Sequence, residues 1–154
     1  MDYLIVKWIH VLASTVLFGT GVGSAFYLLL ASRQRDAAIA AFVARRVVLA
    51  DWLFTATTVI VQPLSGAWLV HRAGFAWSSR WLATSLVLFA IAVACWLPVV
   101  VLQLRMRDVA GAAARNGEPL PPAYARLTRW WIALGVPAFV AFLAIFWLMV
   151  AKPV

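Results

Sequence analysis

Charged residues are scarce in this chain of 154 residues: 12% are Asp, Glu, Lys or Arg, whereas 66% are hydrophobic. Soluble domains are about half apolar and about a quarter charged, so a single core of this size cannot bury the apolar surface encoded here. The low polarity also excludes an intrinsically disordered chain. Composition therefore predicts a small integral membrane protein.

Cysteine, methionine and acidic residues are also few. The single cysteine, Cys95, excludes a disulfide scaffold. The three methionines, Met1, Met106 and Met149, do not cluster along the chain, which argues against a copper-handling site. The net charge is +8, but the basic residues fall in short clusters between long apolar runs. That pattern is typical of topology signals and anionic lipid headgroups, so we expect a lipid bilayer and no nucleic acid as the partner.

Long apolar runs are the dominant feature, and four of them cover about residues 3–30, 47–70, 81–104 and 130–151. A bilayer core of about 30 Å is crossed by about 20 helical residues, so each run is long enough to span it. The first run is too long for a signal peptide and lacks a basic leader, so we expect it to remain in the mature protein. Because the connections are short, the chain is predicted to be a single all-α domain over 1–154, an antiparallel four-helix membrane bundle.

The distribution of basic residues predicts the orientation. Arginines are concentrated in 31–46 and 105–129, the connections on one side of the predicted bundle. The other side holds four basic residues: Lys7, Arg72, Arg80 and Lys152. By the positive-inside rule, the arginine-rich connections face the cytoplasm. We therefore expect a multi-pass protein of the bacterial inner membrane with both termini and the 71–80 turn on the periplasmic side.

Polar residues inside the runs recur at helical spacing. The first run carries Tyr3, Lys7, His10, Ser14, Gly21 and Ser24; the second carries Asp51, Thr55, Thr58, Gln62 and Ser65. Polar groups in a bilayer face a partner, so the first two helices are expected to face each other. Asp51 is the single acid within a run, and an interfacial ion pair with Arg45 and Arg46 is the simplest interpretation.

Only two histidines occur, and the predicted topology brings His10 and His71 to the same side of the membrane. An imidazole inside a span is either a hydrogen-bonded core residue or a functional group. We expect His10 to face the bundle interior near residues 65–68. The functional alternative is haem, which requires only one or two axial ligands and an apolar slot.

In the haem interpretation, His10 ligates the haem iron and His71 is a second, tentative ligand. Lys7 and Arg80 would then neutralise the propionates. No closed zinc site is expected, because the lone cysteine lies too deep to join the histidines. Nor does the sequence contain a nucleophile with a paired base or a phosphate-binding glycine loop, so no catalytic residues are predicted.

Short motifs along the chain resemble a known bacterial family. They read Lys7-Trp8-Ile9-His10, Phe18-Gly19, Phe26-Tyr27, Gln62-Pro63-Leu64-Ser65-Gly66, Arg80-Trp81-Leu82 and Trp96-Leu97-Pro98-Val99-Val100. Together they resemble the predicted integral membrane proteins called domain of unknown function 2269, over essentially the whole chain. This resemblance implies four spans and no particular activity.

Lys7 and His10 also resemble the Lys-x-x-His of HemJ-type protoporphyrinogen oxidases, with a weaker likeness to the membrane domain of CopD-type copper proteins. The HemJ likeness implies a haem b bound through histidine.

Three functions therefore stay open. The first is a non-catalytic accessory or assembly component, whose partner is another membrane protein or a second copy of itself. The second is a haem b-binding membrane redox protein with His10 as axial ligand. The third is a small oligomeric transporter with the Asp51–Ser65 stripe along its path.

Overall fold

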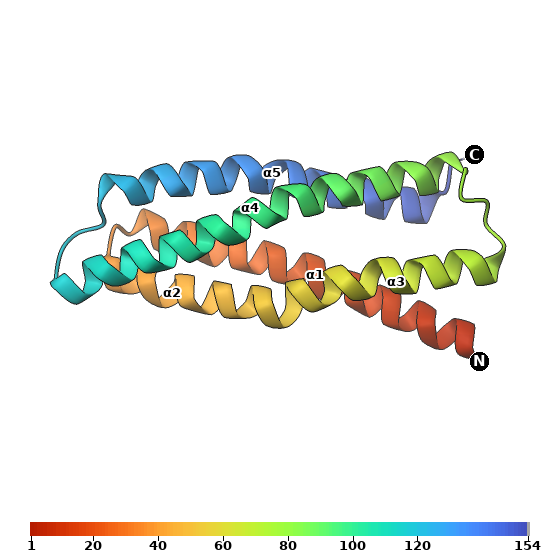
Figure 1. Ribbon diagram of the computed structural model, residues 1–154, viewed down its shortest axis with the longest axis horizontal. Helices are drawn as coiled ribbons and strands as arrows, with labels where there is room; N and C mark the ends of the chain where they lie inside the picture. The colour runs from red at the N-terminus through yellow and green to blue at the C-terminus, as the bar shows by residue number, and fades with distance from the viewer. Residues whose placement is uncertain (154) are drawn as a thin grey trace.

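The computed structural model describes residues 1–153, and these residues are helical along nearly their whole length and contain no strand (Figure 1). The helices are α1 (Asp2–Arg33), α2 (Ala37–Ala50), α3 (Ala56–Ala73), α4 (Arg80–Asn116) and α5 (Pro122–Ala151). A π-helical turn, η1 (Asp51–Thr55), joins α2 to α3 without interruption. The expectation of an all-helical protein is confirmed.

Three helices, α1, α4 and α5, are long and apolar enough to cross a membrane. The remaining predicted span, 47–70, falls on α2, η1 and α3 and is not among these three. The π turn divides this stretch, so neither α2, of 14 residues, nor α3, which contains Gln62, His71 and Arg72, is long and apolar enough by itself. Its helix also begins earlier than predicted, at Ala37, because Asp36 caps it by accepting hydrogen bonds from the backbone N–H groups of Ala38 and Ile39.

The other helix ends follow from local sequence. α3 stops at Gly74 and α4 at Gly117, which adopt left-handed conformations with φ of 70° and 67°. Glycine reaches this region without steric cost and commonly ends helices in this way. α5 begins at Pro122, whose fixed φ and missing N–H suit the first helical position. α5 therefore starts before its predicted membrane part, 130–151.

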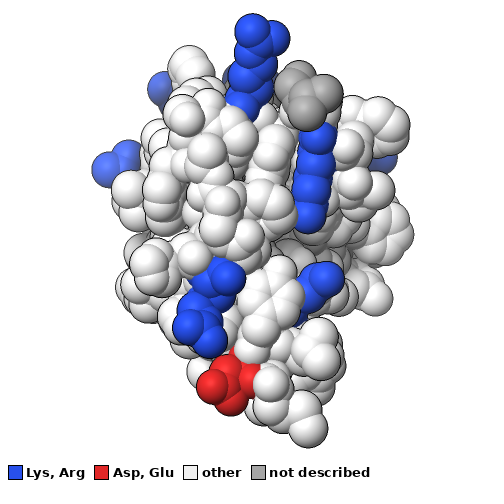
Figure 2. All heavy atoms as spheres, turned by 90° about the vertical axis from the view of Figure 1, so that its right-hand side faces the viewer, with Lys and Arg blue, Asp and Glu red and all other residues white. Residues whose placement is uncertain are grey.

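The two ends of the molecule are distinct. Figure 1 shows both termini and the α3–α4 turn at one end, which we call the terminal end. The connections α1–α2 and α4–α5 lie at the opposite end, which we call the arginine end because its segments carry Arg33, Arg35, Arg45, Arg46, Arg105, Arg107, Arg115, Arg126 and Arg129. Figure 2 looks onto the terminal end, where a few basic and acidic side chains stand among mostly uncharged ones.

Packing also differs along the long axis. α4 packs along α5, and α2 packs on α4, whereas α3 packs mainly on α1. The largest buried cluster lies toward the arginine end and includes Leu28, Ala40, Ala44, Met106 and Tyr124. A smaller one, Val70, Trp81 and Leu82, closes the terminal end beside the α3–α4 turn. Between these clusters the helices leave a cavity.

Candidate functional site

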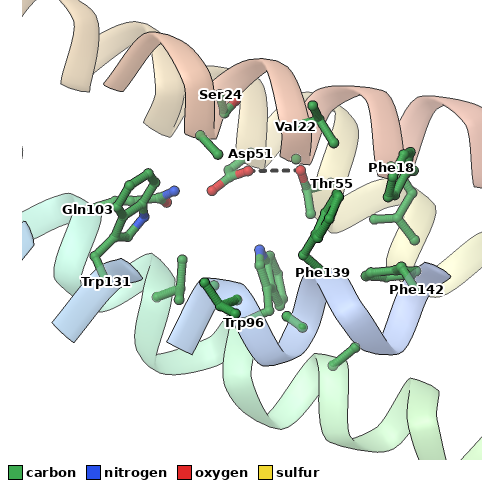
Figure 3. A pocket seen from close by; sticks show the side chains of 18 of the residues that line it. Phe18, Val22, Ser24, Asp51, Thr55, Trp96, Gln103, Trp131, Phe139 and Phe142 are labelled. Carbon is green, nitrogen blue, oxygen red and sulfur yellow. Dashed lines mark hydrogen bonds between the residues drawn. The ribbon is translucent and has the colours of Figure 1, made fainter. Parts of the chain in front are cut away.

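A cavity of about 370 Å³ lies inside the helical assembly, lined by residues of α1, η1, α3, α4 and α5 (Figure 3). Its walls are mostly apolar, and the aromatic ones are Phe18, Phe26, Trp96, Trp131, Phe139 and Phe142. Cavities of this size are typical of small-molecule sites, which combine apolar walls with a few placed polar groups. The polar groups here come from η1 and α4, with Ser24 added from α1.

The π-helical turn places Asp51 in the cavity wall. The Asp51 side chain is only 5% exposed, and the Thr55 hydroxyl donates a 2.8 Å hydrogen bond to its Oδ1. The second carboxyl oxygen, Oδ2, has no hydrogen-bond partner within residues 1–153. Single π turns within α-helices are frequent at functional sites, because the extra residue in the turn re-aims the side chains that follow.

Two further polar side chains reach the same cavity from α4. Gln103 is only 4% exposed, and its Oε1 has no partner in the described part of the chain. The indole Nε1 of Trp96 is likewise buried and without a partner there. Figure 3 shows the Gln103 amide and the Trp96 indole pointing into the space that Asp51 faces. Two acceptors and one donor therefore meet in one apolar chamber.

The cavity opens sideways between α1 and α5. Several of its lining residues are also exposed on the outer surface: Val22 and Phe26 of α1, and Ile132 and Val136 of α5. On these apolar helices, an exposed face lies against lipid acyl chains. Toward the terminal end, Phe18 closes the gap by stacking on Phe139 at 5.5 Å between ring centroids. The chamber is thus accessible from the bilayer.

His10 lies outside this cavity, at the contact between α1 and α3. Its Nδ1 is 2.8 Å from the Ser65 hydroxyl oxygen, and its Nε2 is 3.3 Å from the Gln62 side-chain nitrogen. The ring also packs on Gly66, where an added Cβ would lie 3.2 Å from the imidazole Cε1. The prediction that His10 faces the interior near residues 65–68 is confirmed.

The hydrogen bonds assign roles to both ring nitrogens. The Ser65 hydroxyl donates to the Val61 carbonyl oxygen, so it accepts from His10 Nδ1–H. His10 Nε2 is then the unprotonated nitrogen and accepts from the Gln62 amide. Haem iron would require this same Nε2 lone pair, so the observed arrangement does not fit haem ligation unless Gln62 withdraws.

The other residues of the haem interpretation lie apart from His10. Lys7, His71 and Arg80 are exposed, and within residues 1–153 no hydrogen bond or ion pair joins them to His10 or to one another. The same residues contain no cluster of three or more His, Cys, Asp or Glu side chains that would hold a metal ion. Haem b and its four residues stay a prediction.

The expected ion pair of Asp51 with Arg45 and Arg46 is wrong. Both arginines are exposed, and Arg46 lies over the Phe42 ring at 5.1 Å. α2, η1 and α3 form one continuous helical rod, and Asp51 lies on its buried side, opposite the two arginines. Proximity in sequence therefore does not bring the charges together. The ion pair that residues 1–153 do form joins Arg107 to Asp108.

Sequence reasoning missed Gln103 and Trp96. The signals were present but weak. Trp96 is the one tryptophan away from the predicted membrane boundaries, and Gln103 is the polar residue closest to the inner end of the third run. Neither signal reveals a shared cavity with Asp51, because that depends on how α4 is rotated against η1.

Long helices with apolar, exposed faces around a small buried polar centre define an integral membrane protein. The chain belongs to the DUF2269 family of predicted integral membrane proteins, whose family profile matches residues 4–153. No curated protein and no solved structure matches the chain. The likeness to HemJ- and CopD-type proteins therefore stays a prediction.

Proposed function

We propose that the protein crosses the bacterial inner membrane four times as an antiparallel bundle, with both termini on the periplasmic side. Three helices suffice to span by themselves, and the α2–η1–α3 rod runs beside them in Figure 1. Arginines gather at one end, as the positive-inside rule requires of the cytoplasmic side. At 1.5 Å per residue, the 37 residues of α4 extend about 55 Å, well beyond a bilayer core of about 30 Å, so the arginine end projects into the cytoplasm.

Cysteine labelling tests this topology. In a Cys95→Ala background, Ser78→Cys places a thiol in the α3–α4 turn, and Asn116→Cys places a matched exposed thiol at the arginine end. A membrane-impermeant maleimide applied to intact spheroplasts is expected to label the first variant only, and the second after permeabilisation. The reverse pattern would invert the topology, and equal labelling of both would contradict the single span, α4, that the proposal places between the two positions.

Within the membrane, we infer a non-catalytic accessory role: binding a small, mainly apolar molecule that enters the cavity from the lipid. The observation that carries this inference is the convergence of unpaired polar atoms of Asp51, Gln103 and Trp96 on one chamber. Each buried polar group without a partner costs about 1–3 kcal/mol, so a ligand that pairs with them gains specific affinity. An apolar body fills the aromatic walls, and the opening between α1 and α5 gives it a path.

A small apolar photoprobe tests the inference. We expect 3-trifluoromethyl-3-phenyldiazirine, photolysed in membranes containing the protein, to form adducts on Trp96 and Trp131 inside the cavity. Gly135→Leu is expected to suppress these adducts, because Gly135 lines the cavity and nothing lies within 4 Å of an added Cβ. Gly19→Leu is the matched control, since Gly19 also has open space but is not part of the lining. Adducts confined to outward-facing residues would overturn the proposed site.

A further inference from the structure

The Asp51 carboxyl in the cavity wall limits what can bind there. Asp51 is the only charged residue among those that line the cavity, and it forms no ion pair within residues 1–153. The neutral Thr55 hydroxyl donates a hydrogen bond to it, and its other polar neighbour, the Gln103 amide, is neutral as well. A carboxylate in a low-dielectric interior is costly unless an opposite charge compensates it. The described part of the chain supplies no such charge, so the carboxyl is either protonated or paired with a cation that a ligand brings.

The remaining walls fit the same kind of ligand. The Oε1 atom of Gln103 adds a second unpaired acceptor beside the carboxylate. The rings of Trp96, Trp131, Phe18 and Phe139 line the rest of the chamber, and aromatic faces attract cations. Asp51 Oδ2 and Gln103 Oε1 are thus the two acceptors that suit a cation, within walls that otherwise favour apolar groups.

We propose that the cavity selects an apolar organic cation, such as an aromatic or alkyl ammonium compound. The cationic centre lies against Asp51 Oδ2 and Gln103 Oε1, and the apolar body lies against the aromatic walls. The opening between α1 and α5 admits such a molecule from the bilayer, where amphipathic cations accumulate. This proposal rests on the proposed ligand-binding function and adds the ligand's charge.

Two probes of the same shape isolate that charge. Phenyltrimethylammonium and tert-butylbenzene differ in a nitrogen in place of a carbon, and hence in one positive charge. Each competes with the diazirine photoprobe for labelling of Trp96, and the concentration that halves the adduct yield is measured. Because the two compounds partition differently into membranes, the comparison is made for each compound between wild type and variant.

Asp51→Asn keeps the oxygen that accepts from Thr55 and removes the charge. We expect it to raise the half-protecting concentration of phenyltrimethylammonium at least about tenfold, which corresponds to about 1.4 kcal/mol. Protection by tert-butylbenzene is expected to stay within about twofold, which also reports that the cavity is intact. Asp108→Asn, which removes an equal charge from an exposed position outside the lining, is expected to change neither value.

The outcomes separate the two proposals. If Asp51→Asn changes protection by both compounds equally, or by neither, selection for a cation is overturned while the binding site stands. If neither compound protects Trp96 in the wild-type protein although the photoprobe labels it, the cation proposal is overturned. If the photoprobe labels no cavity residue at all, the proposed function fails as well.

Discussion

The two ends of this molecule are held together in different ways. At the arginine end, α2 presents the small buried residues Ala40 and Ala44 in a cluster with Met106 of α4. At the terminal end, the long contact between α1 and α3 includes one polar group, His10 with Ser65 and Gln62. Small residues let helix backbones approach closely, and side-chain hydrogen bonds also link helices in a membrane.

The difference explains where the cavity lies. Close packing of α2 on α4 ends at η1, and beyond it α3 turns its buried residues toward α1. The cavity lies between the α2–α4 contact and the α1–α3 contact. Its polar groups therefore lie where neither contact fills the interior. The cavity thus lies between an end packed through buried alanines and an end joined through a polar contact.

The largest expected effect comes from removing the most buried side chain of the arginine end. Met106→Ala is expected to lower the free energy of unfolding by about 2–5 kcal/mol, because Met106 is completely buried and its loss leaves a void. Unfolding is followed by circular dichroism during titration of mixed micelles with a denaturing detergent. Leu97→Ala, at an exposed position of the same helix, serves as the control and is expected to stay within about 0.5 kcal/mol. Equal losses at the two positions would mean that the burial of Met106 does not stabilise the arginine end.

The contact between α2 and α4 through the buried alanines Ala40 and Ala44 is tested by introducing a larger side chain. Ala40→Leu adds a large side chain where α2 meets α4, and we expect a loss of about 1–3 kcal/mol in the same titration. Ala38→Leu, on the exposed face of the same helix, should leave the midpoint nearly unchanged. If Ala40→Leu is as well tolerated as its control, then close approach of α2 and α4 does not depend on small residues.

A smaller effect is expected at the start of α2. Asp36→Ala removes both hydrogen bonds to the backbone N–H groups of Ala38 and Ile39 and should cost about 1 kcal/mol. Asp36→Asn retains the accepting oxygen and is expected to recover most of that loss. Failure of the asparagine variant to do so would mean that charge, rather than capping, is what Asp36 contributes.

The smallest effect is expected at the terminal end. Ser65→Ala removes the acceptor of the His10 Nδ1–H bond and should cost about 0.6 kcal/mol, the average for hydrogen bonds between helices in a membrane. Ser78→Ala, in the exposed α3–α4 turn, provides the baseline. A loss as large as that of Met106→Ala would reverse the comparison and make the terminal end the stronger of the two.

The amino-acid sequence by itself determined that the chain is helical, apolar and membrane-embedded, and that its termini lie at one end. These properties follow from the length and number of apolar runs, and from short connections that force neighbouring helices to reverse direction. Helical spacing also placed His10 against residues 65–68, because a polar side chain in a span must face a partner.

Tertiary structure decided the rest. Sequence placed Asp51 near Arg45 and Arg46, but the π turn at η1 and the rotation of the rod turn it to the buried side. Gln103 and Trp96 lie about 50 residues further along the chain and join Asp51 only because α4 packs beside η1 with that face inward. The rotation of a helix about its own axis is fixed by how its side chains pack against the neighbouring helices. The sequence of one helix does not specify that packing.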